Sequence, residues 1–220
     1  MESKSTTAPS TAICFALAEE AGVFNKTYTG NAPVFFTGIG RFNAEKAVKN
    51  FLETNKPGLL FTCGFAGGLV SELKIGDLVF EIPFSDGDIY TSVRSKLTAA
   101  GAKAAKIACV DRIATTAKEK KKLREETGGD AAEMESGAVQ AICKERGVPC
   151  VTLRVISDTA DEDLPLDFNN FLKEDKSLDM SKLMMAVAKA PWKMGALMEL
   201  QKNTKLAAQR LSEVLIKVIG

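Results

Sequence analysis

The sequence contains no histidine in its 220 residues. This absence excludes a Ser-His-Asp or Cys-His nucleophile system, an HExxH metalloprotease and any zinc or iron site with histidine ligands. Acid–base chemistry near neutral pH must therefore be carried by a carboxylate, a lysine, a tyrosine or a cysteine whose pKa is shifted by its surroundings.

An excess of charge of one sign is also missing. The 29 Lys and Arg residues nearly balance the 28 Asp and Glu residues, which gives a net charge of +1. A field of that size does not attract nucleic acid or an anionic membrane, so we expect a small-molecule partner and no nucleic acid. The five cysteines form no CxxC pair, and four of them lie in or beside apolar runs. This usage predicts buried, reduced thiols in a cytoplasmic protein.

Long hydrophobic runs are absent as well. Residues 1–10, MESKSTTAPS, are polar, and we predict a disordered segment there. The apolar run that follows, TAICFALA, is too short to span a bilayer, so we predict no signal peptide and no membrane span. With 45% hydrophobic and 26% charged residues the composition is that of a globular protein, and we assign residues 11–220 to a single domain.

Apolar runs of strand length alternate with amphipathic stretches along the chain. The predicted strands are residues 12–17, 34–37, 59–63, 77–82, 105–110 and 150–156. The predicted helices are residues 43–54, 117–126, 133–146 and a long C-terminal region from about 180 to 218. The strands lack polar alternation, which is typical of central strands covered on both faces. The repeated βαβ order predicts an α/β fold, a three-layer αβα sandwich around a mostly parallel sheet.

The segments outside the predicted sheet differ in charge and spacing. In the helix at residues 117–126, the lysines are interpreted as a solvated face: Lys118, Lys120, Lys121 and Lys122. The C-terminal region has apolar residues at helical spacing and charges of both signs, which favours a core or partner-packing helix over a membrane-surface helix. Between Ser157 and Met180 the chain is acidic, and we predict a loop with at most a short helix that forms a rim over a site.

Two glycine-rich segments follow predicted strands. Gly38-Ile39-Gly40-Arg41 opens a helix, where free backbone N–H groups suit an anion, although a plain tight turn has the same residues. A dinucleotide-binding GxGxxG motif that starts at Gly38 would need glycine at its sixth position, which is Asn43 here. This departure argues against a nicotinamide-dependent oxidoreductase. Gly64, Gly67 and Gly68 follow the most apolar strand and fit either a ligand site or a structural bend.

Three carboxylates are predicted to meet at one edge of the sheet. Glu135 lies at the start of a predicted helix, and Asp158 follows the strand after it. Because the helix leads away from this edge and the parallel strand returns to it, both carboxylates are expected to face one cleft, which Glu20 reaches from the first strand. Taken singly, Glu133 and Glu135 also suit a helix N-terminus, and Asp158 suits a cap. Together, in a chain without histidine, the three carboxylates are a candidate catalytic group.

Five segments match a known family in order and spacing over about residues 11–172. They are Ala16-Leu17-Ala18-Glu19-Glu20, Gly38-Ile39-Gly40, Gly64-Phe65-Ala66-Gly67-Gly68-Leu69, Glu133-Met134-Glu135-Ser136 and Arg154-Val155-Ile156-Ser157-Asp158. With these segments the sequence resembles the nucleoside phosphorylase family that includes methylthioadenosine/S-adenosylhomocysteine nucleosidase. Val110-Asp111-Arg112 and the run at residues 158–165 are most similar to the hopanoid-associated phosphorylase branch.

The resemblance implies an enzyme that cleaves the N-glycosidic bond of a purine nucleoside, by phosphorolysis or hydrolysis. It implies that Asp158 protonates the leaving purine, that Glu135 holds the ribose hydroxyls and that Glu20 positions water. Met134 would pack against the sugar. The implied substrate-binding set also includes Glu133, Phe65, Ala66, Gly67 and Ser157. For phosphorolysis, the candidate phosphate-binding residues are Gly40 and Arg41 at the first glycine turn, or Arg112, although surface arginines need no such role. No cofactor or metal is implied, only inorganic phosphate as a co-substrate, and the assembly implied is a homodimer.

The sequence departs from this family at three places. Phe65 replaces the usual Ser or Thr, and Ile113-Ala114 provides no aromatic to stack on the base. The segment at residues 83–105 is short, which implies an open site suited to a bulky apolar 5′-substituent on the nucleoside. A non-catalytic nucleoside-binding or sensor protein with the same fold is the alternative that these departures favour.

Overall fold

The computed structural model describes residues 10–83, 87–173 and 179–220, so nearly all of the predicted disordered segment lies outside the described residues. The described residues form one sheet of eight strands: β1 (Thr11–Phe15), β2 (Val34–Phe36), β3 (Leu59–Gly68), β4 (Leu78–Glu81), β5 (Lys103–Ala104), β6 (Ile107–Cys109), β7 (Ala131–Glu133) and β8 (Cys150–Asp158). The order across the sheet is β2-β1-β3-β8-β4-β5, and β7 pairs with β3 and β6. Among these strands, β4–β8 and β3–β7 are the antiparallel pairs, so the sheet is mostly parallel, as predicted.

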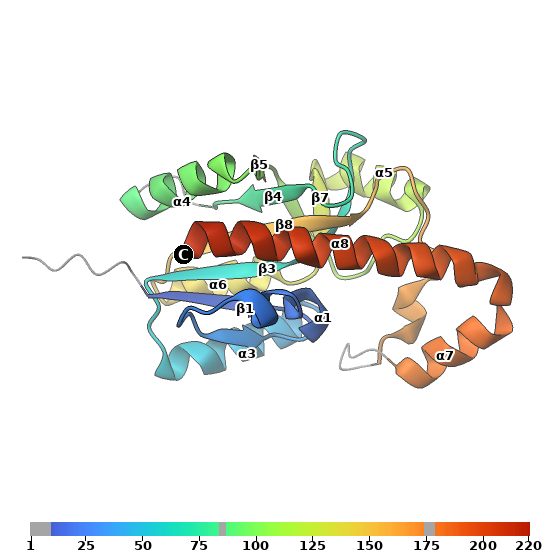
Figure 1. Cartoon of the computed structure of the whole chain (residues 1–220), viewed down its shortest axis with the longest axis horizontal. Coiled ribbons are helices and arrows are strands. Elements are labelled where there is room, and N and C mark those ends of the chain that lie inside the picture. The colour runs from blue at the N-terminus through green and yellow to red at the C-terminus, as the bar shows by residue number, and fades with distance from the viewer. Residues whose placement is uncertain (1–9, 84–86, 174–178) are drawn as a thin grey trace, which may run out of the picture.

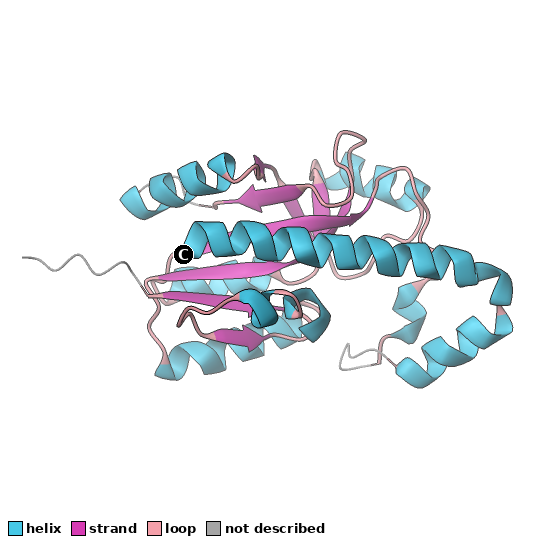
Figure 2. Cartoon of the chain, viewed as in Figure 1, coloured by secondary structure: helices cyan, strands magenta, loops and turns pink. Residues whose placement is uncertain are grey.

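Helices cover both faces of this sheet (Figure 1). On one face α3 (Arg41–Thr54) packs against α6 (Ser136–Glu145), and α8 (Met194–Ile219) crosses the other face along β8 and β3. The remaining helical elements are α1 (Ala18–Ala21), α2 (Phe24–Thr27), α4 (Asp88–Ala99), α5 (Ala117–Thr127), η1 (Phe168–Phe171), α7 (Met180–Lys189) and η2 (Pro191–Lys193). Figure 2 shows the strands enclosed between these helices, which confirms the αβα sandwich.

Two apolar clusters lie on the two sides of the sheet. Along β1, Ile13 and Phe15 face the cluster that contains Leu211 of α8, whereas Cys14 faces the cluster that contains Val48 of α3. Both faces of the strand are thus buried, which explains why its sequence lacks polar alternation. Each fully buried Leu or Phe side chain contributes roughly 1.5–3 kcal/mol to stability.

Three of the differences between the structure and the predicted elements concern the longest segments. β3 continues through the glycine segment to Gly68 because Gly64 and Gly67 stay paired with β8, so the predicted end of this strand at residue 63 is wrong. α4 was not predicted, although its buried Tyr90, Val93 and Leu97 follow helical spacing. The C-terminal region is interrupted where Pro191 begins η2, because proline cannot donate the helical hydrogen bond. Within the described ranges, no helix has the length and apolarity needed to cross a bilayer.

Candidate active site

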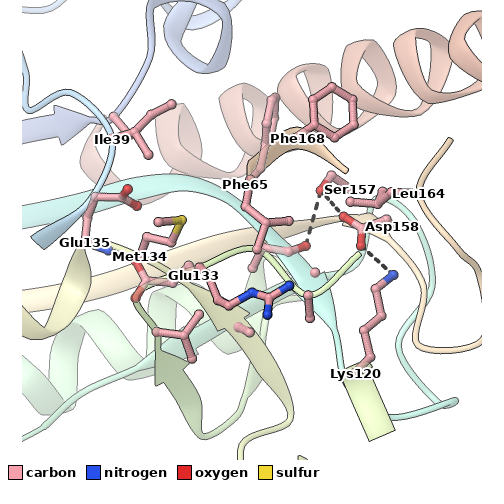
Figure 3. A pocket seen from close by; sticks show the side chains of 18 of the residues that line it. Ile39, Phe65, Lys120, Glu133, Met134, Glu135, Ser157, Asp158, Leu164 and Phe168 are labelled. Carbon is pink, nitrogen blue, oxygen red and sulfur yellow. Dashed lines mark hydrogen bonds and ion pairs between the residues drawn. The ribbon is translucent and has the colours of Figure 1, made fainter. Parts of the chain in front are cut away.

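A cavity of about 270 Å³ opens where β1, β3 and β8 end (Figure 3). Its lining includes Glu20, Glu135 and Asp158, so the structure brings together the three carboxylates that the sequence analysis placed at one sheet edge. This is the place where ligands bind in open α/β sheets, because the loops after parallel strands diverge there.

Glu20 is fixed at the junction of β1 and β3. One carboxylate oxygen, Oε2, accepts hydrogen bonds from the backbone N–H groups of Ala16 and Leu17, each at 2.9 Å. The other, Oε1, accepts from Phe65 N at 2.8 Å. Burial raises the pKa of Glu20 above its ordinary value, although the three N–H groups act in the opposite direction.

The space for this carboxylate depends on Gly64. A Cβ atom at Gly64 would lie 2.6 Å from Glu20 Oε1, a separation that no real contact reaches. The neighbouring glycine on β3, Gly67, has the same relation to Asp158, whose Oδ2 would be 3.0 Å from an added Cβ. Two glycines of β3 therefore make room for two of the carboxylates that line the cavity.

The prediction that Glu133 begins a helix is wrong. Glu133 ends β7, because its backbone pairs with β6. Its carboxylate pairs with the guanidinium of Arg154, at 2.5 Å, and both side chains are buried. Glu133 also accepts hydrogen bonds from the Ser136 hydroxyl at 2.7 Å and from the Ser136 and Glu135 N–H groups. Burial alone would raise the pKa of Glu133, but Arg154 and Ser136 more than compensate and hold it below its ordinary value.

Glu135 precedes α6 and reaches across to the first glycine turn. Its Oε1 accepts a hydrogen bond from the backbone N–H of Gly40 at 2.7 Å, so the anion at this helix start is one of the chain's own carboxylates. Burial, followed by the negative charge of Glu133, raises the pKa of Glu135 to about 7. A carboxyl group in that range changes its protonation state near neutral pH, which a histidine would do in other proteins.

Asp158 lies at an irregularity in β8. The pairing with β3 shifts between Ala66 and Gly67, so that Gly67 pairs with Asp158 and Ser157 is the extra residue. Such a bulge interrupts the alternation of side chains, and Ser157 and Asp158 consequently both line the cavity. The Ser157 hydroxyl donates to Asp158 Oδ1 at 2.8 Å (Figure 3).

Lys120 is the partner of Asp158, and the prediction that it is solvated is wrong. Its side chain is 1% exposed, and its Nζ lies 2.6 Å from Asp158 Oδ2. The ammonium group also donates to the carbonyl oxygens of Thr159 at 2.6 Å and Glu162 at 3.0 Å, which uses its three N–H bonds. Lys118, Lys121 and Lys122 are exposed, as predicted.

The groups predicted to bind phosphate have other partners. Gly40 donates to Glu135, as described, and Arg41 lies 3.7 Å from Asp111 on the exposed surface. Arg112 lines the cavity, but its guanidinium pairs with Glu119 at 2.9 Å. Among the described residues, no cluster of acidic or cysteine side chains has the arrangement of a metal site.

Apolar side chains close the rest of the cavity. Met134, Phe65 and Ala66 line it, as predicted, together with Ile39 (Figure 3). Leu164 and Phe168 approach from the segment after β8, so the predicted rim is confirmed and η1 is its short helix. Phe168 was not singled out from the sequence, although an aromatic residue within an acidic rim was the available signal.

Comparison with known proteins identifies the family to which this site belongs. The family model described as the phosphorylase superfamily matches residues 81–219. A 5′-methylthioadenosine/S-adenosylhomocysteine nucleosidase from Exiguobacterium is 32% identical, over 76% of this chain and 84% of that protein. The chain belongs to the phosphorylase superfamily.

Two further proteins are similar to this phosphorylase-superfamily chain, one in sequence and one in structure. An aminodeoxyfutalosine nucleosidase from Campylobacter jejuni is 30% identical, over 62% of this chain and 72% of that protein. The crystal structure of the Neisseria meningitidis 5′-methylthioadenosine/S-adenosylhomocysteine nucleosidase in complex with methylthio-immucillin-A matches with a TM-score of 0.69 at 18% identity. That match covers 95% of this chain and 97% of the Neisseria chain, and it confirms the fold.

Most of the site residues predicted for a phosphorylase-superfamily member do line the cavity. The exceptions are Gly40 and Arg41, which line a neighbouring depression that shares Met134 with the cavity. Sequence reasoning missed Lys120 and Arg154, the two buried cations that pair with Asp158 and Glu133. Membership of the hopanoid-associated branch stays a prediction.

Proposed function

We propose that this chain is a nucleosidase that hydrolyses the N-glycosidic bond of a purine nucleoside. The observation that carries the proposal is the convergence of Glu20, Glu135 and Asp158 on one cavity, each held by different donors. Cleavage of this bond proceeds through an oxocarbenium-like sugar, which nearby carboxylates stabilise, and the departing base needs a proton donor. The relatives named as nucleosidases support the same reaction.

Asp158 delivers the proton to the leaving purine, and Lys120 supplies it. The two groups form an ion pair at 2.6 Å. The Lys120 ammonium passes a proton along this contact to Asp158 Oδ2, which makes Asp158 a carboxylic acid. The carboxylic acid then donates its proton to the purine as the C–N bond breaks, so the base leaves as a neutral molecule.

Glu135 and Glu20 act on the sugar side. The Glu135 carboxylate accepts hydrogen bonds from the ribose hydroxyls, and Met134 beside it packs against the sugar ring. Glu20, fixed by its three backbone donors, orients a water molecule and takes the proton that the water loses on attacking the sugar. Glu133, whose oxygens are engaged by Arg154 and Ser136, positions Glu135 and Met134.

The positions and the ion-pair partners of the basic groups favour hydrolysis over phosphorolysis. Gly40 and Arg41 lie outside the cavity lining, and Arg112 is paired with Glu119. Phosphorolysis is the second candidate, because Arg112 does line the cavity and Glu119, its partner, is partly exposed. A phosphate ion would have to displace Glu119 in order to bind Arg112.

The apolar lining supports a nucleoside with an apolar 5′-substituent. Part of the cavity lining consists of large apolar side chains, namely Leu164, Phe168 and Leu200. Phe65 and Phe168 also supply aromatic rings, which compensates for the aromatic missing at Ile113-Ala114. A homodimer and a cytoplasmic location remain predictions.

The proposal is tested by incubating the protein with methylthioadenosine in ¹⁸O-labelled water, with and without inorganic phosphate. We expect free adenine at the same rate in both buffers and one ¹⁸O atom in the released sugar. Formation of a sugar 1-phosphate only when phosphate is present would replace hydrolysis by phosphorolysis. Thermal stabilisation by nucleosides of several classes without release of any base would establish the non-catalytic binding protein instead.

A further inference from the structure

We propose that residues 180–205, called the arm below, form a surface that docks on anionic lipid membranes. The arm consists of α7, η2 and the first half of α8, and it projects beyond the edge of the sheet (Figure 1). The inference concerns a surface outside the cavity lining described above, apart from Leu200, and it does not depend on the proposed reaction.

The first observation is a concentration of exposed apolar side chains. Of the nine large hydrophobic residues in the described part of the chain with at least 44% of their surface exposed, six lie on the arm: Met180, Met184, Met185, Trp192, Met194 and Met198. By contrast, α8 beyond the arm buries Leu211, Leu215 and Val218 in the core. The C-terminal region therefore splits into a core helix, as predicted, and an apolar surface that the fold leaves uncovered.

The second observation is the charge of the same segment. The arm carries five lysines and one glutamate, whereas the rest of the chain holds 24 basic and 27 acidic residues. Within the described part of the chain, Lys189, Lys193 and Lys205 have no carboxylate at ion-pair distance. The net charge of +1 thus conceals a basic arm on an otherwise slightly acidic molecule, which corrects the expectation drawn from the total.

Methionine, tryptophan and lysine side chains on one amphipathic segment have the chemistry of an interfacial anchor. Apolar groups enter the boundary between headgroups and acyl chains, tryptophan prefers that boundary, and lysines remain beside anionic headgroups. On α8, Met194, Met198 and Lys205 lie on one face, since they are separated by four and seven residues. A second copy of the arm is a poorer occupant, because a two-fold contact between arms would bring like charges together.

Trp192 makes the test direct, because it is the single tryptophan of the chain and is 77% exposed. Its fluorescence is recorded while vesicles of phosphatidylcholine, with or without about a third phosphatidylglycerol, are added. We expect a blue shift and co-sedimentation with the anionic vesicles, reversed by high salt, and neither with pure phosphatidylcholine. No shift, an equal shift with neutral vesicles, or a shift that depends on protein concentration alone would overturn the proposal.

Charge-reversal variants distinguish vesicle binding by the arm from vesicle binding by basic residues elsewhere on the surface. The triple variant Lys189→Glu, Lys193→Glu, Lys205→Glu is expected to bind anionic vesicles at least about tenfold more weakly. The control reverses three exposed lysines elsewhere, Lys46→Glu, Lys118→Glu and Lys121→Glu, and we expect it to retain binding. If the arm variant loses its helical circular dichroism, Trp192→Ser with Met198→Ser replaces it in the sedimentation assay. Undiminished binding by a folded arm variant, or equal loss in the control, would refute docking by the arm.

Discussion

At the scale of single residues, the site depends on buried cations that cannot be told from ordinary surface lysines and arginines in the sequence. Lys120 is one of four lysines within five positions of α5, and a helix rotates by about 100° per residue, so the four cannot share one face. Lys120 points away from Lys118 and Lys122 and into the site. The periodicity therefore contains the signal for a buried lysine, but its partner Asp158, far along the chain, is visible only in the fold.

Replacement of this lysine tests the proton path. We expect Lys120→Met to release base about 10²-fold more slowly than wild type at neutral pH, because Asp158 loses its proton source. Removing one partner of a buried pair should also cost roughly 3 kcal/mol of stability. Initial rates across pH and chemical denaturation measure both effects.

Lys121→Met is the matched control, since the neighbouring lysine is exposed, and it should change neither quantity. The double variant Lys120→Met, Asp158→Asn should be more stable than Lys120→Met alone, because no unpaired carboxylate remains. A Lys120→Met variant that is stable and fully active would show that the pair is incidental.

The carboxylate of Glu135 links stability to pH. Its folded-state pKa of about 7 lies above the ordinary 4.5, so its stabilising contribution is complete below pH 4.5 and is lost as pH rises through 7. Glu135→Gln should therefore gain stability relative to wild type as pH rises through this window, by roughly 3 kcal/mol once the pH is above 7, while base release falls. Thermal or urea unfolding at several pH values measures the gain. Glu145→Gln, which changes an exposed glutamate of the same helix, is the matched control.

At the scale of elements, β3 and β8 shape the site through glycine and a bulge. The strands themselves were predictable, since their apolar runs read as buried β-structure. Their true length was not, because extended glycines that pair with β8 resemble a turn in sequence. The shift at Ser157 depends on how the two strands pair, a property that neither strand encodes alone.

Alanine substitutions on β3 test this close fit. Gly64→Ala should displace the Glu20 carboxylate and Gly67→Ala that of Asp158, because the added Cβ atoms would lie 2.6 Å and 3.0 Å away. We expect each variant to lose base release by about 10²-fold or more while it remains folded. Gly195→Ala in α8, where an added Cβ meets nothing within 4 Å, should keep full activity and gain up to about 1 kcal/mol. Steady-state rates and melting temperatures distinguish these outcomes.

At the scale of the whole molecule, a parallel sheet explains why much of the site was predictable. Strands that end at one edge bring the residues after them together, and thus Glu20, Glu135 and Asp158 could be assigned to one cleft without a structure. Contacts between distant segments, such as that between Arg154 and Glu133, could not be predicted from the sequence, because residue spacing within one segment carries no information about them. The absence of histidine acquires a positive meaning, since a carboxyl group with a pKa of about 7 and a lysine–aspartate pair provide proton chemistry.

The central claim is that carboxylates cleave a purine nucleoside with Asp158 as the acid. Its most direct test compares wild type with Asp158→Asn on two substrates in phosphate-free buffer, methylthioadenosine and a nitrophenyl riboside whose leaving group needs no proton. We predict that the variant loses adenine release by about 10²–10⁴-fold but cleaves the nitrophenyl riboside within a few-fold of wild type. Equal adenine release by the folded variant, or equal loss on both substrates, would contradict the account.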